Sequence, residues 1–146
     1  LLESGRRTSM ARRLIVGGGV VVPTVVLLGL LAYGLATLPP LLARPPAGSL
    51  VVRVEGEQWW WRVRYPGPGG ATVELANELW LPVGEPVEVE LASADVVHSF
   101  WVPALAGKVD AIPGRTTRLT LLPTRAGSYR GVCAEFCGAS HALMAL

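Results

Sequence analysis

The amino-acid sequence predicts an all-β domain, a small sandwich or barrel, preceded by a single membrane-spanning α-helix. Residues 14–38 form an apolar run of 25 residues without a charged side chain. After residue 50, short segments alternate apolar and polar residues, and turn-forming Gly and Pro recur about every 8–12 residues. No amphipathic helical pattern is apparent there. The mean hydropathy of +0.42 also indicates that part of the chain does not face water.

The apolar run is long enough to cross a membrane, since about 20 apolar residues span the hydrocarbon core. A secretory signal peptide is the alternative, although it favours a shorter apolar core and a small-residue cleavage site. Four arginines precede the run and one follows it, so the positive-inside rule predicts that residues 1–13 are cytoplasmic. The remainder would lie on the periplasmic side of the inner membrane. Residues 39–49, rich in proline, are expected to end the helix and form a stiff linker.

Residues 50–146 form the predicted β domain. Residues 50–66 are expected to form two strands around a turn at Gly56, with Trp59 and Trp61 on one face of the second strand and Trp60 on the other. Residues 85–93 alternate cleanly, so Glu88 and Glu90 are predicted to share a face. Further short strands are expected in TTRLTLLP and GSYRGVC. With eight basic and ten acidic side chains, residues 48–146 are mildly acidic and show no basic stripe, so no nucleic-acid partner is expected.

The stretch GVCAEFCGASHALM, residues 131–144, holds the chain's only two cysteines. Cys133 and Cys137 are followed at short intervals by His141 and Met144. A disulfide is the simplest alternative in an exported domain, but it leaves the histidine and methionine unexplained. Zinc would use the thiolates and imidazole but rarely a thioether. Thiolate, thioether and imidazole together favour copper, and each of two thiolates can bridge two metal ions.

A second imidazole is needed to complete such a site, and the chain has only two histidines. His98 stands in SADVVHSFWVP beside apolar residues, where a lone histidine is more often a packed core residue. Because it is the only other imidazole available, His98 becomes the predicted partner of the C-terminal cluster.

Residues 76–121 and the stretch GSYRGVCAEFCGASHALM resemble subunit II of the haem–copper cytochrome c oxidases, and QWWWRVRY resembles the aromatic segment of that family. The resemblance implies a cupredoxin-like Greek-key barrel or sandwich that carries two copper ions as a binuclear copper A centre. Both cysteines would bridge the two coppers. The remaining copper ligands would be His98, His141, Met144 and the backbone carbonyl of Glu135.

The same resemblance gives further expectations. The Glu135 carboxylate would reach a magnesium or manganese ion shared with subunit I. Trp59 would be the point at which electrons arrive from cytochrome c, and Asp95 would help to dock that basic protein. The partners would be the haem-bearing subunit I, cytochrome c and the lipid bilayer. The chain would act in a proton-translocating oxidoreductase by transferring electrons, with oxygen reduced to water in subunit I.

Two departures from the family pattern predict a fragment. One membrane helix is visible where the family commonly has two, and the chain stops two residues after Met144, where a closing strand usually follows. Three other kinds of protein fit the sequence less well. A membrane-anchored copper-assembly or thiol-redox factor would require a βαβ pattern, which is missing. A quinol-oxidase homologue would lack the copper ligands. A nitrous oxide reductase domain is usually part of a soluble enzyme.

Overall fold

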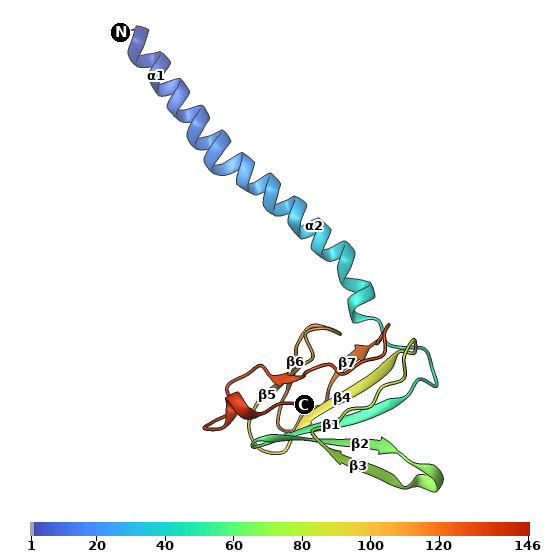
Figure 1. Ribbon diagram of the computed structural model, residues 1–146. Helices are drawn as coiled ribbons and strands as arrows, with labels where there is room; N and C mark the ends of the chain where they lie inside the picture. The colour runs from blue at the N-terminus through green and yellow to red at the C-terminus, as the bar shows by residue number, and fades with distance from the viewer. Residues whose placement is uncertain (1) are drawn as a thin grey trace. The chain divides into compact units, whose positions relative to one another are not determined.

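A computed structural model describes residues 2–146, with the side chains of all of these except residues 2–7 and 40–42. The chain divides into two compact units, one ending at Ala43 and the other beginning at Arg44. The first is helical and the second is a β domain (Figure 1).

The N-terminal unit is one helical run made of α1 (Leu2–Arg13), a π-helical segment (Leu14–Val21) and α2 (Val22–Leu42). Within it, Thr8–Pro39 is long and apolar enough to cross a membrane, with a mean hydropathy of 2.5. At about 1.5 Å per residue these 32 residues extend about 48 Å, against roughly 30 Å for a hydrocarbon core.

The helix ends within the proline-rich segment 39–49, but it runs past the predicted span of residues 14–38, because α2 continues to Leu42. Pro39 and Pro40 therefore lie in the last helical turn. Proline adopts a φ close to the helical value, but each proline here removes one backbone hydrogen bond and its ring crowds the carbonyl four residues back, so the helix ends soon after.

The β domain is a sandwich of two sheets (Figure 1). The larger sheet has the strand order β3-β2-β1-β4-β7. Its strands are β1 (Val51–Glu57), β2 (Trp60–Pro66), β3 (Thr72–Ala76), β4 (Val87–Ser93) and β7 (Thr117–Leu121). The smaller sheet has the order β6-β5-β8 and consists of β5 (His98–Trp101), β6 (Val109–Ala111) and β8 (Val132–Cys133). Short 3₁₀ turns occupy Pro68–Gly70 and His141–Leu143. The sandwich preceded by one apolar helix confirms the predicted fold class.

The core lies between the two sheets and follows the predicted alternation. Val87, Val89 and Leu91 of β4 are fully buried, as are Trp61 and Val63 of β2. The fully buried side chains each contribute about 1.5–3 kcal/mol through the apolar area removed from water. Trp61 packs edge-on against Phe100 of the smaller sheet, with ring centroids 5.4 Å apart. This contact joins the larger sheet to β5, the strand that begins with His98.

The predicted turn at Gly56 is wrong. Gly56 lies inside β1, where it pairs with Trp61 of β2, and the turn is made by Gln58 and Trp59. Trp59 is therefore in the turn and not in the second strand. Glycine usually marks a turn, but a glycine inside a strand can also mark a close approach of another group. The ring of His98 makes that approach.

The outer face of the larger sheet carries a ladder of ion pairs. Arg118 of β7 binds Glu88 and Glu90 of β4, and Arg53 of β1 also binds Glu90. Glu88 and Glu90 therefore share one face, as predicted, and on that face both form ion pairs and are partly exposed to solvent. Exposed ion pairs of this kind contribute little individually, about 0–1 kcal/mol each.

Two neighbouring strands of the larger sheet run in the same direction. β1 and β4 pair in parallel, with Gly56 opposite Ser93. Because parallel strands end at the same edge, the β1–β2 turn meets the loop between β4 and β5, and Ala94 N–H donates to the Gly56 carbonyl at 3.0 Å. This pairing brings Gln58 and Trp59 beside Asp95 and His98.

Candidate metal centre

The C-terminal loop that carries most of the predicted ligands is fixed by backbone hydrogen bonds. Cys133 N–H donates to the Met144 carbonyl at 3.0 Å, and Gly131 and Leu146 exchange two further bonds. The loop therefore leaves β8 at Cys133 and returns beside it at Met144. The 3₁₀ turn between them has three residues per turn, so it places His141 and Met144 on the same side.

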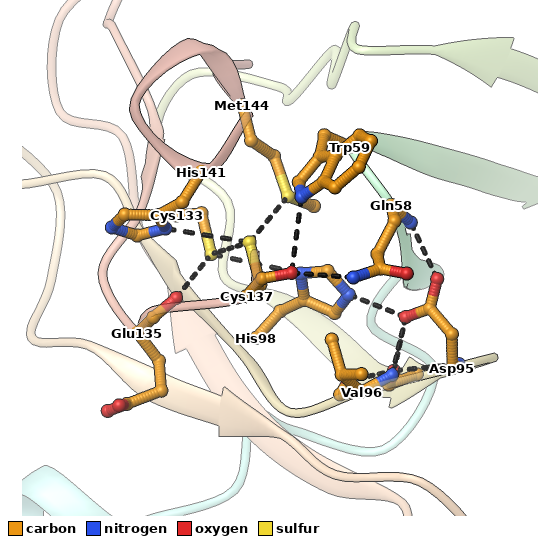
Figure 2. Close-up of polar contacts among 11 residues, drawn as sticks. Gln58, Trp59, Asp95, Val96, His98, Cys133, Glu135, Cys137, His141 and Met144 are labelled. Carbon is orange, nitrogen blue, oxygen red and sulfur yellow. Dashed lines mark hydrogen bonds and ion pairs between the residues drawn. The ribbon is translucent and has the colours of Figure 1, made fainter. Parts of the chain in front are cut away.

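This loop and the start of β5 bring six donor atoms together (Figure 2). The two sulfurs of Cys133 and Cys137 are 3.8 Å apart, and both cysteines are free and buried. Each remaining donor lies near one of these sulfurs. His98 Nδ1 is 3.8 Å from Cys133 Sγ, and the Glu135 carbonyl oxygen is 3.2 Å from the same sulfur. His141 Nδ1 is 3.5 Å and Met144 Sδ is 3.8 Å from Cys137 Sγ.

His98 is held in one orientation. Its ring is fully buried, and its Nε2 lies 2.8 Å from Asp95 Oδ1. A carboxylate at this position favours the proton on Nε2, which leaves the Nδ1 lone pair directed towards the cysteine sulfurs. Asp95 thus occupies a position that fixes the tautomer of a candidate ligand.

Asp95 is itself hydrogen-bonded on several sides. It accepts bonds from the backbone N–H groups of Gln58 and Val96, each at 2.6 Å. Partial burial raises the pKa of the Asp95 carboxyl, but the bonds from His98, Val96 and Gln58 outweigh it and leave the pKa below its ordinary value. The carboxylate that was predicted to dock a partner therefore also has a role inside the site. Its side chain is 30% exposed.

Glu135 presents its two ends in different directions. Its backbone carbonyl faces the Cys133 sulfur, whereas Figure 2 shows its carboxylate pointing away from the cluster. The residue is exposed. The two roles expected for Glu135 are therefore geometrically separate, one towards the sulfurs and one towards the surface.

Trp59 lies beside the cluster at the surface. The residue is 36% exposed, and its indole Nε1–H donates to the Cys137 carbonyl at 3.1 Å. The residue predicted to receive electrons thus has one direct hydrogen bond to the backbone of a candidate ligand. Gln58, which donates to the same carbonyl at 2.7 Å, was missed in the sequence. Only its position immediately before the aromatic segment could have drawn attention to it.

Without metal, the Cys137 thiol favours its neutral form. Burial, followed by the proximity of Cys133, raises the pKa of the Cys137 thiol to about 12. Metal ions require the thiolate, so binding would release a proton from this residue.

The donor set fits copper. The ligand atoms of His98, Cys133 and Cys137 all lie within 4.8 Å of one another, and all three residues are buried. Zinc is bound by four ligands at about 2.0–2.3 Å and seldom by a thioether. Met144 is only 2% exposed, and its Sδ faces Cys137. The buried donor atoms therefore include three soft sulfurs, which favours copper.

Comparison with known proteins identifies the family. The model of the cytochrome c oxidase subunit II periplasmic domain matches residues 68–146. Cytochrome c oxidase subunit 2 of Alkalihalophilus pseudofirmus is 45% identical over 96 residues, which are 66% of this chain and 27% of that protein. The chain spans between 27% and 44% of the length of three such relatives.

Solved structures agree. The periplasmic domain of subunit II of cytochrome oxidase (CoxB) from Bradyrhizobium japonicum is 32% identical, with a TM-score of 0.63 over 70% of this chain and 84% of that one. Another structure is a mixed-disulfide intermediate between a thioredoxin-like protein and subunit II of cytochrome c oxidase. It is 33% identical, with a TM-score of 0.59 over 72% of this chain and 82% of that one. The chain therefore belongs to the cytochrome c oxidase subunit II family.

Proposed function

We propose that this chain is the electron-transfer subunit of a terminal respiratory oxidase. In this role it would receive electrons from cytochrome c and deliver them to the haem of subunit I, where oxygen is reduced to water. Bound copper would supply one-electron transfer. The complex would be a proton-translocating oxidoreductase, and this chain would carry out none of the oxygen chemistry.

The convergence of six donor atoms carries the proposal. We assign the ligand set to His98, Cys133, Cys137, His141 and Met144 together with the carbonyl of Glu135. Two sulfurs 3.8 Å apart, each with an imidazole nitrogen nearby, suit two copper ions that share both thiolates. A buried site on a β scaffold limits ligand movement when its charge changes, which favours fast electron transfer.

The two sides of the site suit two partners. Trp59 is exposed and bonded to Cys137, which supports its assignment as the residue facing cytochrome c, with Asp95 nearby. The Glu135 carboxylate points elsewhere, which supports its assignment to a magnesium or manganese ion shared with subunit I.

The N-terminal helix would hold the copper domain at the membrane. We assign residues 14–38 as the membrane span, residues 1–13 to the cytoplasm and residues 39–49 to a linker. The copper domain, residues 50–146, would then lie on the periplasmic side. A hydropathy of 2.5 and a helix with none of its apolar window buried support this assignment.

A thiol-redox role concerns the metal-free chain. A relative forms a mixed disulfide with a thioredoxin-like protein. Cys133 and Cys137 are close enough that oxidation could join them with little movement, and a joined pair could not bind copper. A thioredoxin-like reductant is therefore a partner we propose for the chain before copper binding.

The test is copper reconstitution of the full chain, purified in detergent under reducing conditions. We expect two copper ions per chain and a seven-line electron paramagnetic resonance spectrum, because one unpaired electron would be shared by two copper nuclei. A His98→Ala chain should not give this spectrum. One zinc ion per chain, or a Cys133–Cys137 disulfide in the active protein, would contradict the proposal.

A further inference from the structure

The β1–β2 turn contributes no predicted copper ligand, yet it contacts both ligand-bearing segments. Gln58 makes two hydrogen bonds in opposite directions (Figure 2). Its backbone N–H donates to Asp95 Oδ2 at 2.6 Å, and its side-chain Nε2 donates to the Cys137 carbonyl at 2.7 Å. Since Asp95 also binds His98 Nε2, a continuous hydrogen-bonded chain joins His98 to Cys137 through Gln58.

Gly56 lies directly against the His98 ring. A Cβ atom at position 56 would be 2.7 Å from His98 Cδ2 and 2.9 Å from Cγ, closer than real Cβ contacts. Gly56 is buried within β1, and its φ is outside the left-handed region, so the need for glycine is steric. The strand therefore provides a flat surface on which the imidazole rests.

The other side of the turn fits equally closely. A Cβ at Gly138 would be 3.0 Å from Gln58 Nε2 and 3.1 Å from Trp59 Cζ2. Because Gly138 has no side chain, the N–H groups of Gln58 Nε2 and Trp59 Nε1 have just enough space to reach the Cys137 carbonyl. A glycine therefore stands at a close contact on each side: Gly56 against His98, and Gly138 against Gln58 and Trp59.

The hydrogen bonds of Gln58 are not needed for the stability of the fold. Gln58 is exposed, and its bonds are made by one side-chain amide and one backbone group, so a substitution that keeps its size should leave the fold nearly unchanged. Hydrogen bonds to the partners and backbone of metal ligands, by contrast, fix ligand orientation, and their loss typically costs about 10–100-fold in metal affinity or activity.

We propose that Gly56 and Gln58 are positioning residues for the metal centre: Gly56 supports the His98 ring, and Gln58 fixes the distance between the His98 segment and the Cys137 loop. The inference rests on the proposed function, since it assumes that these segments bind copper. It extends the functional part of the chain to a turn without metal ligands.

The first experiment uses two variants of the full chain at position 58. Gln58→Met keeps the length of the side chain and removes its donor, and Gln58→Glu places a carboxylate oxygen against the Cys137 carbonyl. We expect both to unfold at the wild-type temperature when metal-free. With copper, both should show a shifted sulfur-to-copper absorption band and a shifted reduction potential, more so in Gln58→Glu. Wild-type absorption and potential in both variants would overturn the role of Gln58.

The second experiment compares Gly56→Ala with Gly107→Ala. Gly107 has no neighbour within 4 Å of an added Cβ, so it reports the effect of a methyl group without the contact. We expect Gly56→Ala to lose copper to a competing chelator at least about tenfold faster than wild type, and Gly107→Ala to match wild type. Equal copper retention in the two variants would overturn the role of Gly56.

If the wild-type chain itself binds no copper pair, the proposed function fails first. If wild type binds the pair and the variants are unchanged, only this inference fails.

Discussion

The ligand loop (Cys133–Met144) and the end of β1 with the β1–β2 turn (Gly56–Trp59) lie against each other but differ in what they contribute. The loop supplies five of the six donors within twelve consecutive residues. The turn supplies none, and yet it donates both side-chain hydrogen bonds that the Cys137 carbonyl accepts among the described residues. The difference teaches that the chemistry of this site is local in sequence, whereas its geometry is set by contacts between distant segments.

The largest effect is expected in the loop. Cys137→Ser removes the sulfur that lies nearest to both His141 Nδ1 and Met144 Sδ. We expect complete loss of the two-copper spectrum, because a hydroxyl is a poor bridging ligand for copper. Copper content by elemental analysis and the paramagnetic resonance spectrum would measure it, with Ser140→Ala as a control in the same loop. A two-copper spectrum in Cys137→Ser would show that the sulfur is not a bridge.

A second effect concerns the metal-free loop and pH. The folded chain holds the Cys137 proton more tightly than the unfolded chain does, since its pKa is raised from 9.0 to about 12. Its stabilising contribution is therefore complete below pH 9 and is lost as the pH rises towards 12. Urea unfolding of the metal-free chain at a series of pH values should show this decline, and Cys137→Ser should show less of it. Parallel pH profiles for the two chains would argue against the raised pKa.

A third prediction tests the contact between the loop and the turn. Gly138 has a φ of +119, so Gly138→Ala combines backbone strain with the close approach of Gln58 and Trp59. Gly84→Ala is the matched control, because Gly84 has a φ of +82 and no neighbour within 4 Å of an added Cβ. We expect a cost of about 1 kcal/mol in the free energy of unfolding for Gly84→Ala and about 2–4 kcal/mol for Gly138→Ala. Equal costs would mean that the contact is unimportant.

A fourth prediction concerns the turn alone. Trp59→Phe keeps an aromatic ring but removes the N–H that donates to the Cys137 carbonyl. We expect two coppers per chain to be retained, while reduction by cytochrome c slows by roughly tenfold, because loss of a hydrogen bond to a metal-ligand residue commonly costs about 10–100-fold in activity. Stopped-flow kinetics would measure the rate, and Trp80→Phe, at another exposed tryptophan, is the control. An unchanged rate would remove Trp59 from the electron path.

The smallest effect is expected for the thioether. Met144→Leu preserves a buried apolar side chain but removes Sδ, which is 3.8 Å from Cys137 Sγ. We expect the two-copper centre to assemble, with a shifted reduction potential and slower electron transfer. Redox titration alongside copper analysis would show this. Loss of all copper would mean that the thioether is essential for assembly.

The fold class and the strands of the core could be predicted from the sequence. The alternation in β4 follows directly from one face being buried, and Val87, Val89 and Leu91 are indeed fully buried. The turn could not be placed, because Gly56 carries the same local signal whether it makes a turn or receives a side chain from another segment. The last residue of helix α2 could not be predicted either, since a pair of prolines does not determine how many residues beyond the first proline remain helical.

Cys133, Cys137, His141 and Met144 could be proposed as ligands from spacing and residue type, because thiolates, imidazole and thioether at short intervals favour copper. The Glu135 carbonyl came only from the family resemblance. Gln58 could not be proposed, since its bond to Cys137 joins residues 79 positions apart. The bond that Asp95 accepts from His98 spans only three positions, but it depends on the conformation of the loop that follows β4. Contacts of this kind become visible only when the parallel β1–β4 pairing is known.

The β1–β4 pairing also makes the metal site a check on correct folding. A slip of β1 by one residue would replace Gly56 by Glu55 or Glu57 beneath the His98 ring. Either side chain would fill the space that the imidazole requires and displace the bonds of Gln58. Copper would then bind well only to molecules in the native register. Metal uptake would thus select correctly paired strands from misaligned ones and would stabilise that pairing by mass action.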